Sequence, residues 1–133
     1  MAMSEDFKGR ERRRFKRVRV NFTAIFRIDK PIYVRMMAGN REVDGVLLDL
    51  SEGGLCILAT LDIPAATVLL IKFVLIDAHS FAEERIAKMD VVGEVRYNIS
   101  FGKTEHRLGI CFTQISDKDR KTIADFVDTR IST

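Results

Sequence analysis

The sequence contains no tryptophan, only two prolines and two cysteines, and no long uninterrupted apolar run in its 133 residues. The longest such run, Val68–Ile76, is broken by Lys72 and is much shorter than the about 20 residues that a membrane-spanning helix needs. Cys56 and Cys111 each stand alone within an apolar segment, which favours buried, reduced thiols over a disulfide between them. The first residues show no apolar leader, so we expect no secretory signal, no transmembrane segment and a cytoplasmic protein.

Side chains that could act in catalysis or bind a metal are also few. His79 and His106 are isolated, and neither has a cysteine or carboxylate at metal-ligand spacing, so we expect no metal site. Ser51 has no evident histidine partner, and the chain has neither a P-loop nor a GxGxxG motif. We therefore predict no catalytic residues, no bound cofactor and no enzymatic activity.

The composition, with 47% apolar and 31% charged residues, and the length of the chain are typical of one globular domain. Alternation of apolar and polar positions predicts six strands. In the fifth of these the alternating positions are Val91, Gly93, Val95 and Tyr97. The predicted strands are Val18–Ile28, Glu42–Leu50, Leu55–Ala59, Thr67–Ile76, Met89–Ile99 and His106–Ile115.

Three segments are harder to interpret. Residues 67–76 are so uniformly apolar that we expect both faces of this strand to be covered. Residues 32–37, which follow Pro31, are compatible with a further short strand. Residues 79–88 are charged and favour a loop or a single helical turn.

After Ile115 the apolar period changes to that of a helix. Ser116 is a candidate N-cap, and the apolar positions of the segment then share one helical face. These positions are Ile123, Phe126, Val127 and Ile131. The sequence therefore predicts a mainly β fold, a small closed barrel of six antiparallel strands capped by one C-terminal α-helix.

The positive charge is concentrated near the N-terminus. The window Lys8–Arg19 holds eight lysines and arginines against the single anion Glu11, which gives a local charge of +7. Subtracting +7 from the total of +3 leaves −4 for the other 121 residues. Arginine predominates, and its planar guanidinium can hold a phosphate or the O6/N7 edge of guanine with two hydrogen bonds. This arm alone is equally typical of a solvated charged surface or of one half of an anion site.

The segment Asp49-Leu50-Ser51-Glu52-Gly53-Gly54 predicts a hairpin turn between two strands. It admits a purely structural interpretation, because aspartate and serine bond to nearby backbone and glycine adopts positive φ. It also admits a functional one. Asp49 could accept hydrogen bonds from a ligand, Ser51 offers a hydroxyl, and Gly54 would let a base or phosphate approach the backbone.

Together, the two motifs are more specific. An Arg-x-x-x-Arg arm from Arg13 to Arg17, followed by Asp-x-Ser-x-x-Gly from Asp49 to Gly54, resembles the PilZ family of bacterial receptor domains for cyclic di-GMP. Gly93–Arg96 and Arg107–Phe112 add to the similarity, which covers residues 11–127. Residues 30–41 depart from it, because this segment is longer than the family usually carries there.

The resemblance implies a PilZ-type split β-barrel and a domain organisation. We expect a flexible N-terminal tail at 1–9 and a single PilZ domain at 10–133. Within that domain, a ligand-binding arm at 10–17 would precede the six-stranded antiparallel barrel at 18–115 and the C-terminal helix at 116–131.

The resemblance also implies the roles of individual residues. Arg13 and Arg17 would wrap over cyclic di-GMP and hold its guanine edges and phosphates. Asp49, Ser51 and Gly54 match the family's turn motif, and Asp49 suits the paired N1–H and N2–H₂ donors of guanine. The ligand would lie on the outer face of the barrel with the arm folded over it.

Arg12, directly before the first motif arginine, predicts the number of ligands. Within the family a basic residue there tends to accompany an intercalated pair of cyclic di-GMP molecules, so we expect Arg12 to contribute to binding and two molecules to bind per protomer. Arg14 and Arg96 could also lie near the ligand. Because Arg96 is equally compatible with an exposed strand position, we leave it outside the core set.

The resulting hypothesis is a second-messenger receptor that relays its signal to an unidentified downstream protein, as a monomer or a homodimer. The alternative is a ligand-independent interaction module whose basic arm binds an acidic protein, nucleic acid or a membrane surface. The intact motifs favour the receptor, and we do not expect nucleic acid to be the partner.

Overall fold

The computed structural model describes residues 15–77 and 85–132. The predicted tail at 1–9, most of the arm, including Arg12 and Arg13, and His79 lie outside these residues. The described part forms six strands and two helices. They are β1 (Arg17–Lys30), α2 (Ile32–Met37), β2 (Val43–Ser51), β3 (Gly54–Ala59), β4 (Val68–Asp77), β5 (Arg85–Phe101), β6 (Glu105–Gln114) and α3 (Asp117–Ser132).

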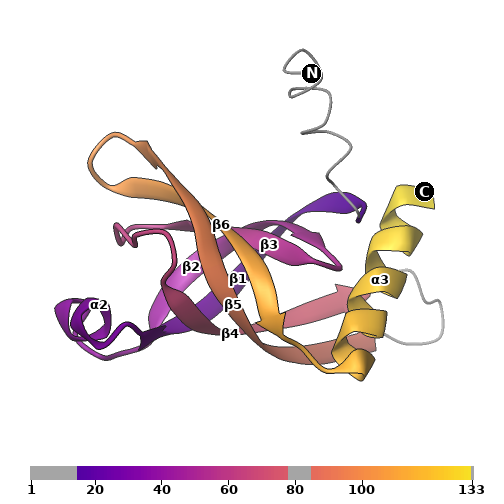
Figure 1. Cartoon of the computed structure of the whole chain (residues 1–133). Coiled ribbons are helices and arrows are strands. Elements are labelled where there is room, and N and C mark those ends of the chain that lie inside the picture. Colours follow the sequence, from indigo (N-terminus) through magenta and orange to yellow (C-terminus); the bar gives the residue numbers. More distant parts are fainter. Residues whose placement is uncertain (1–14, 78–84, 133) are drawn as a thin grey trace, which may run out of the picture.

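The strands form a closed barrel in the order β1-β2-β3-β6-β5-β4, and every neighbouring pair is antiparallel (Figure 1). The long strand β1 closes the barrel, because it pairs with β2 along one edge and with β4 along the other. The predicted fold class, a mainly β six-stranded barrel with a C-terminal helix, is confirmed.

Alternating side chains fill the barrel interior. In β1, Ala24, Phe26 and Ile28 are buried while the residues between them are exposed, as expected for strands with one face inside a barrel. Leu47, Ile57, Leu69, Ile71, Val91, Val95 and Leu108 extend this core from the other strands.

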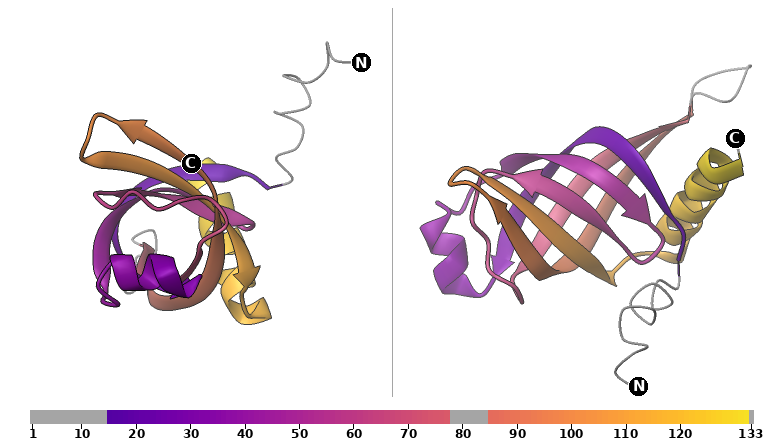
Figure 2. Two further views of the ribbon diagram at one scale, coloured as in Figure 1. Left: turned by 60° about the vertical axis from the view of Figure 1, so that its left-hand side comes forward. Right: turned by 90° about the horizontal axis from the view of Figure 1, so that it is seen from above.

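Helix α3 packs at the end of the barrel where β1 begins (Figures 1 and 2). The Ser116 hydroxyl accepts a hydrogen bond of 3.0 Å from the backbone N–H of Asp119, which confirms the predicted N-cap. Ile123, Phe126 and Val127 are buried, and the Phe126 ring centroid lies 6.0 Å from that of Phe22 in β1. Ile131 was expected on the same buried face but is 45% exposed, because the helix extends past the barrel there.

Residues 32–37 form helix α2, so the expected short strand is wrong. β1 ends at Lys30 and β2 begins at Val43. The residues between them lie outside the barrel, so they have no adjacent strand with which to form backbone hydrogen bonds. A helical turn satisfies its backbone groups locally, through bonds such as the Ala38 N–H to the Val34 carbonyl at 3.1 Å. Figure 2 shows α2 lying across the end of the barrel opposite α3.

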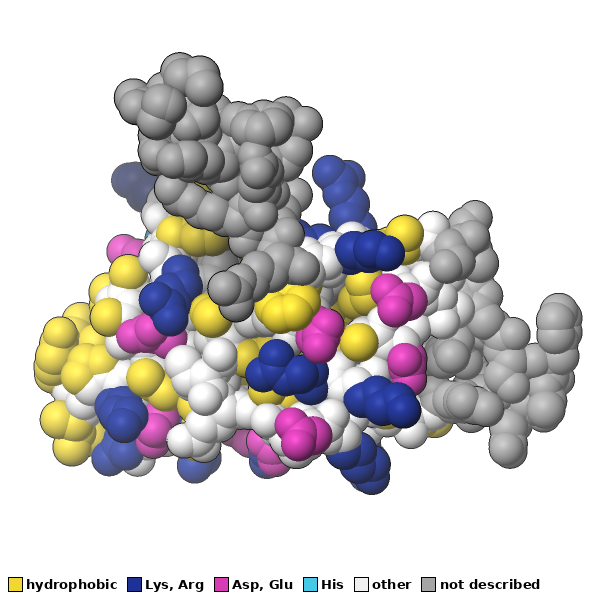
Figure 3. Space-filling view, turned by 45° about the vertical axis from the view of Figure 1, so that its right-hand side comes forward, with side chains coloured by type: hydrophobic (Ala, Val, Ile, Leu, Met, Phe, Trp, Pro, Cys, Tyr) yellow, Lys and Arg dark blue, Asp and Glu magenta, His cyan; other side chains and the backbone are white. Residues whose placement is uncertain are grey.

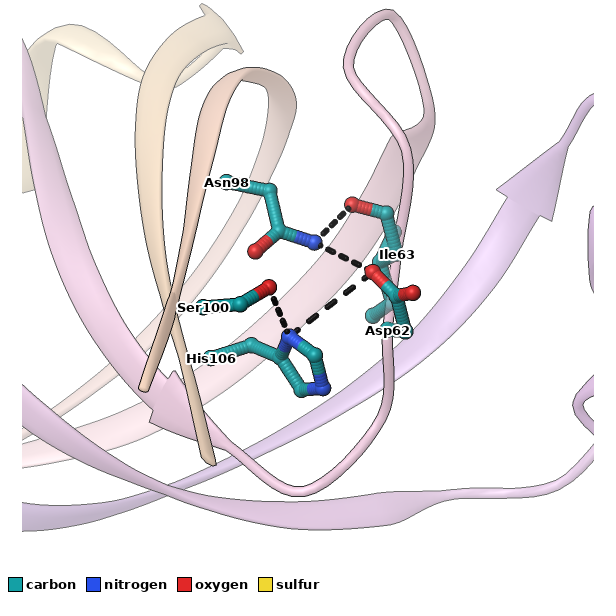
Figure 4. Close-up of polar contacts among 5 residues, drawn as sticks. All are labelled: Asp62, Ile63, Asn98, Ser100 and His106. Atoms are coloured by element: carbon teal, nitrogen blue, oxygen red, sulfur yellow. Dashed lines mark hydrogen bonds and ion pairs between the residues drawn. The ribbon is translucent and has the colours of Figure 1, made fainter. Parts of the chain in front are cut away.

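The same end carries the strap, defined here as residues 60–67, which joins β3 to β4. The Asn98 amide donates hydrogen bonds to Asp62 Oδ1 at 2.8 Å and to the Ile63 carbonyl at 2.9 Å (Figure 4). The buried His106 ring completes this contact, because its Nδ1 lies 2.9 Å from Ser100 Oγ and 3.7 Å from Asp62 Oδ1. These bonds hold the strap against β5 and β6.

Two further expectations are corrected. β4 is covered on its inner face only, since Lys72, Val74 and Ile76 are exposed on the outside, where none of the described residues forms a second layer. Residues 85–88 belong to β5 and pair with the end of β4, so the expected loop or helical turn is wrong for these four residues; residues 79–84 lie outside the described part of the chain. In the part of the chain described, no helix has both the length and the apolar character needed to cross a bilayer.

Candidate functional site

The predicted turn residues lie at a pocket on the outer face of the barrel. Arg17, Asp49, Ser51 and Gly54 all line it, and its volume is about 440 Å³, within the range of small-molecule sites. The walls come from the start of β1, the β2–β3 turn, β5 and β6. The other lining residues are Phe15, Gly53, Leu55, Cys56, Arg96, Tyr97, Gly109, Ile110 and Cys111.

A single row of paired residues runs across five strands at this site. Arg19 of β1 pairs with Asp49, Asp49 with Cys56, Cys56 with Gly109, and Gly109 with Tyr97. Residues far apart in the sequence are thereby side by side on one surface. The row extends from the strand that follows the arginine arm to the aromatic ring of Tyr97.

Register shifts redirect two of these side chains. The pairing slips between Leu47 and Asp49 in β2, and between Val95 and Tyr97 in β5. Leu47 and Val95 are fully buried in the core, whereas Asp49 and Tyr97, two positions later, line the outer pocket. Such bulges commonly re-aim side chains near functional sites. The even alternation read from the sequence would have placed Tyr97 with Val95, which is why Tyr97 was not predicted as a site residue.

Ser51 holds the turn together. Its hydroxyl oxygen accepts hydrogen bonds from the N–H groups of Gly53 and Gly54, and the hydroxyl lies within bonding distance of the Gly54 carbonyl; all three distances are 3.2 Å. One donor and two acceptor positions are all that a serine hydroxyl has. A direct bond from Ser51 to a ligand would therefore replace one of these turn bonds.

Gly54 is required by the approach of β3 to β6. A Cβ atom at this position would lie 2.1 Å from the Ile110 carbonyl oxygen, which is backbone and cannot rotate away. Gly109 has a comparable role beneath an aromatic ring, since a Cβ there would lie 2.0 Å from the ring of Tyr97. The Tyr97 ring thus lies directly on the backbone of β6.

The last residues of the arm meet the turn. A Cβ atom on Gly53 would come within 2.7 Å of the Phe15 ring, so Phe15 rests against this glycine. Arg17 follows at the first position of β1, exposed and paired with Ser51. The structure thus brings Arg17, Asp49, Ser51 and Gly54 together.

The floor of the pocket is uncharged near neutral pH. Burial, and then the neighbouring Asp49 carboxylate, raise the pKa of the Cys56 thiol to about 11. Burial also raises the pKa of Tyr97, whose hydroxyl is hydrogen-bonded to this thiol. Both groups therefore remain protonated at neutral pH. Cys56 and Cys111, both in the pocket wall, are free thiols; Cys56 is buried as predicted, whereas Cys111 is only half-buried.

The charges of the site lie on its rim. Arg96 lines the pocket and forms an ion pair of 3.2 Å with Glu94, with its side chain 59% exposed. With Arg17 it provides two guanidinium groups opposite one carboxylate, Asp49. Figure 3 shows that basic and acidic side chains are interspersed over the described surface in that view. The pocket combines cations, a carboxylate and an aromatic ring, which suits an anionic ligand with a flat heterocycle.

The His106 cluster has a different arrangement from a catalytic triad. Ser100 and Asp62 both approach the same ring nitrogen, Nδ1, whereas a serine–histidine–aspartate triad uses the two nitrogens separately. Among the described residues, no three histidine, cysteine or acidic side chains are grouped so as to hold a metal ion.

The chain matches the family model of the PilZ domain over residues 11–129 and therefore belongs to the PilZ domain family. No curated protein matches the chain.

Solved structures share the fold at low identity. Inhibitor of motility (MotI/DgrA) from Bacillus subtilis superposes with a TM-score of 0.70 at 13% identity, over 90% of this chain and 51% of that protein. YcgR from Escherichia coli in complex with c-di-GMP gives a TM-score of 0.58 at 18% identity, over 89% of this chain and 45% of that one. The chain thus spans about half the length of both proteins. The PilZ domain of YcgR with c-di-GMP gives 0.55 at 17% identity, over 91% and 92% of the two chains.

Replacing Gly54 by alanine should destabilise the protein even without any ligand. The added Cβ would push β3 away from the Ile110 carbonyl, and overpacking of this kind typically costs about 1–3 kcal/mol. Urea denaturation of the ligand-free protein measures the loss. Gly102→Ala is the control, because a Cβ there meets no atom within 4 Å and its cost is limited to the positive φ of 71°. A Gly54→Ala protein as stable as wild type would contradict the structural role.

Proposed function

We propose that this protein is a receptor for cyclic di-GMP, which it binds in the pocket on the outer face of the barrel, and that it acts by binding rather than by catalysis. The observation that carries the proposal is the presence of Arg17, Asp49, Ser51 and Gly54 at one pocket of suitable size. Membership of the PilZ family supports it, as do the similar structures of YcgR with c-di-GMP. We place the protein in the cytoplasm of a bacterium.

The chemistry of the pocket matches the parts of this ligand. Cyclic di-GMP carries two phosphates, which suit the guanidinium groups of Arg17 and Arg96. Each guanine offers N1–H and N2–H₂ as paired donors, which suit the carboxylate of Asp49. The Tyr97 ring, held against Gly109, provides a surface on which a base can stack.

The arm can supply the remaining contacts. Arg13 lies two residues before Phe15, and two residues of extended chain span at most about 7 Å. Since Phe15 rests against Gly53 at the edge of the pocket, the length of the chain would allow Arg13, and Arg12 one residue further away, to reach a bound ligand. We infer that Arg12 and Arg13 join Arg17 in binding, and that two ligand molecules bind per protomer.

We propose that the signal is passed on by ordering of the arm. Each hydrogen bond from a charged arginine contributes about 1.5–3 kcal/mol, which is comparable to the about 1–2 kcal/mol of entropy lost when the backbone of one residue is fixed, so several such contacts are needed to order the arm. An ordered arm would change the surface and charge around residues 8–19, and a downstream protein would recognise this change.

Substitution of the pocket charges should weaken cyclic di-GMP binding selectively. We expect Arg17→Ala, Arg13→Ala and Asp49→Ala each to raise the dissociation constant roughly 10- to 150-fold, because each removes a charge-assisted hydrogen bond. Isothermal titration calorimetry measures the constants. The stoichiometry from the same titrations should be two for wild type.

Matched controls separate this proposal from its rival. Arg27→Ala and Asp44→Ala remove the same charges from the same strands outside the pocket and should leave binding unchanged. If the arm attracted anions only by its charge, Arg27→Ala would weaken binding as much as Arg17→Ala, and Asp49→Ala would strengthen it. Absence of binding and of thermal stabilisation by cyclic di-GMP would overturn the receptor proposal and favour a ligand-independent interaction module.

Tyr97 should contribute through its ring rather than its hydroxyl. Loss of a stacked aromatic ring costs about 1–3 kcal/mol per base, so Tyr97→Ala should weaken cyclic di-GMP binding by roughly tenfold or more. Tyr97→Phe keeps the ring over Gly109 and should bind like wild type. Equal loss in both variants, measured by the same calorimetry, would show that the hydroxyl and not the ring is needed.

Ligand binding should protect the arm from trypsin. If cyclic di-GMP orders residues 10–17, cleavage after Arg12, Arg13 and Arg14 should slow markedly at saturating ligand, as followed by mass spectrometry. The Asp49→Ala variant at the same ligand concentration is the control and should be cleaved at the ligand-free rate. Unchanged cleavage of a wild-type protein shown to be saturated would exclude signalling by arm ordering.

A further inference from the structure

Helix α2 exposes apolar side chains at the end of the barrel opposite α3. Ile32, Tyr33, Met36 and Met37 are 64%, 66%, 60% and 84% exposed, while Val34 alone is buried against the core. In Figure 3, apolar side chains gather at the left edge, the end at which α2 lies. Large exposed apolar patches are uncommon on soluble monomers and usually mark an interaction surface.

These side chains form two neighbouring features. Helical spacing places Ile32 and Met36 together on the side of α2 away from the barrel, and we call this pair the ridge. Tyr33 and Met37 line a hollow of about 410 Å³ between α2 and the strap, which we call the groove. The rest of the groove is lined by Ile28, Val34, Ala38, Leu61, Asp62, Ile63 and Pro64.

The charged residues around this surface have both signs. Asp62, with a side chain 76% exposed, is part of the groove wall. Lys30, Arg35 and Arg41 lie in or beside α2. The Nε atom of Arg35 is buried without a hydrogen-bond partner among the described residues.

We propose that this end of the barrel is a homodimer interface, in which the ridge of each protomer packs into the groove of the other about a two-fold axis. A two-fold interface must be self-complementary, and this patch contains both an apolar projection and a hollow that can receive it. The same docking brings the basic residues in and beside α2 toward Asp62 of the second copy. The ligand pocket shares none of its lining residues with the groove, so this inference does not depend on the proposed ligand.

A second copy accounts for these features better than a membrane surface does. A bilayer would favour cations around the apolar tip, whereas Asp62 stands in the groove itself, and a bilayer makes no use of a hollow. One short helix and one loop offer less area than the about 800 Å² per partner of a standard interface. We therefore expect a weak dimer, which dissociates at micromolar concentrations.

Sedimentation velocity of the full chain from micromolar to millimolar concentration tests the proposal. Ile32→Lys places a charge on the ridge without disturbing the monomer, since the side chain is exposed, and should weaken dimerisation by roughly tenfold or more. Ile86→Lys is the matched control: Ile86 is 62% exposed, but it lies near the start of β5, away from α2, and dimerisation should be unchanged.

The possible results are distinct. A concentration-dependent dimer that is lost in Ile32→Lys but kept in Ile86→Lys supports the interface. A wild-type protein that remains monomeric throughout, or a dimer equally sensitive or insensitive to both substitutions, overturns it. Flotation with vesicles of phosphatidylcholine and phosphatidylglycerol gives the competing outcome, because Ile32-dependent binding of a monomer to vesicles would reassign the surface to membranes.

Discussion

The pairing of β1 with two neighbours is the constraint on which the rest of the structure depends. Residues 17–26 of this strand pair with β2, and residues 24–30 pair with β4, which closes the barrel. Closure leaves the interior to apolar side chains and removes free sheet edges. It also places Arg17, the last residue of the arm, because Arg17 is the first residue of β1 and pairs with Ser51 at the turn motif. The two halves of the proposed site are joined by the same strand that completes the core.

A filled barrel leaves only its outer face and its ends for recognition. On the outer face, the two register shifts in β2 and β5 turn Asp49 and Tyr97 away from the core, so that a carboxylate and an aromatic ring reach the pocket beside Arg17. Close approach of β3 to β6 at Gly54, and of the Tyr97 ring to Gly109, gives this surface its shape. The glycine of the turn motif thus serves the packing of the barrel as well as the pocket.

The two helices differ in how much apolar surface they bury at the two ends of the barrel. Helix α3 buries Ile123, Phe126 and Val127 against the barrel, whereas α2 buries Val34 and leaves its other large apolar side chains exposed. The strap beside α2 is held by Asp62, Asn98 and His106, which makes the groove a defined feature of the surface. Ligand binding on the outer face and association through α2 would therefore use separate parts of one small domain.

The sequence by itself determined the features that depend on neighbouring residues. Strand alternation, the Ser116 cap and the hairpin at residues 49–54 are local, so they could be predicted, and the arm and turn motifs identified Arg17 and Asp49. Only the tertiary structure decided that Cys56, Tyr97 and Gly109 lie in the same pocket as Arg17 and Asp49. Which residues are adjacent there depends on the order of the strands in the barrel and on the register shifts in β2 and β5. It also decided that residues 32–37 form a helix with an exposed apolar surface. A short, continuously apolar segment has no period that distinguishes strand from helix, and its environment depends on distant strands.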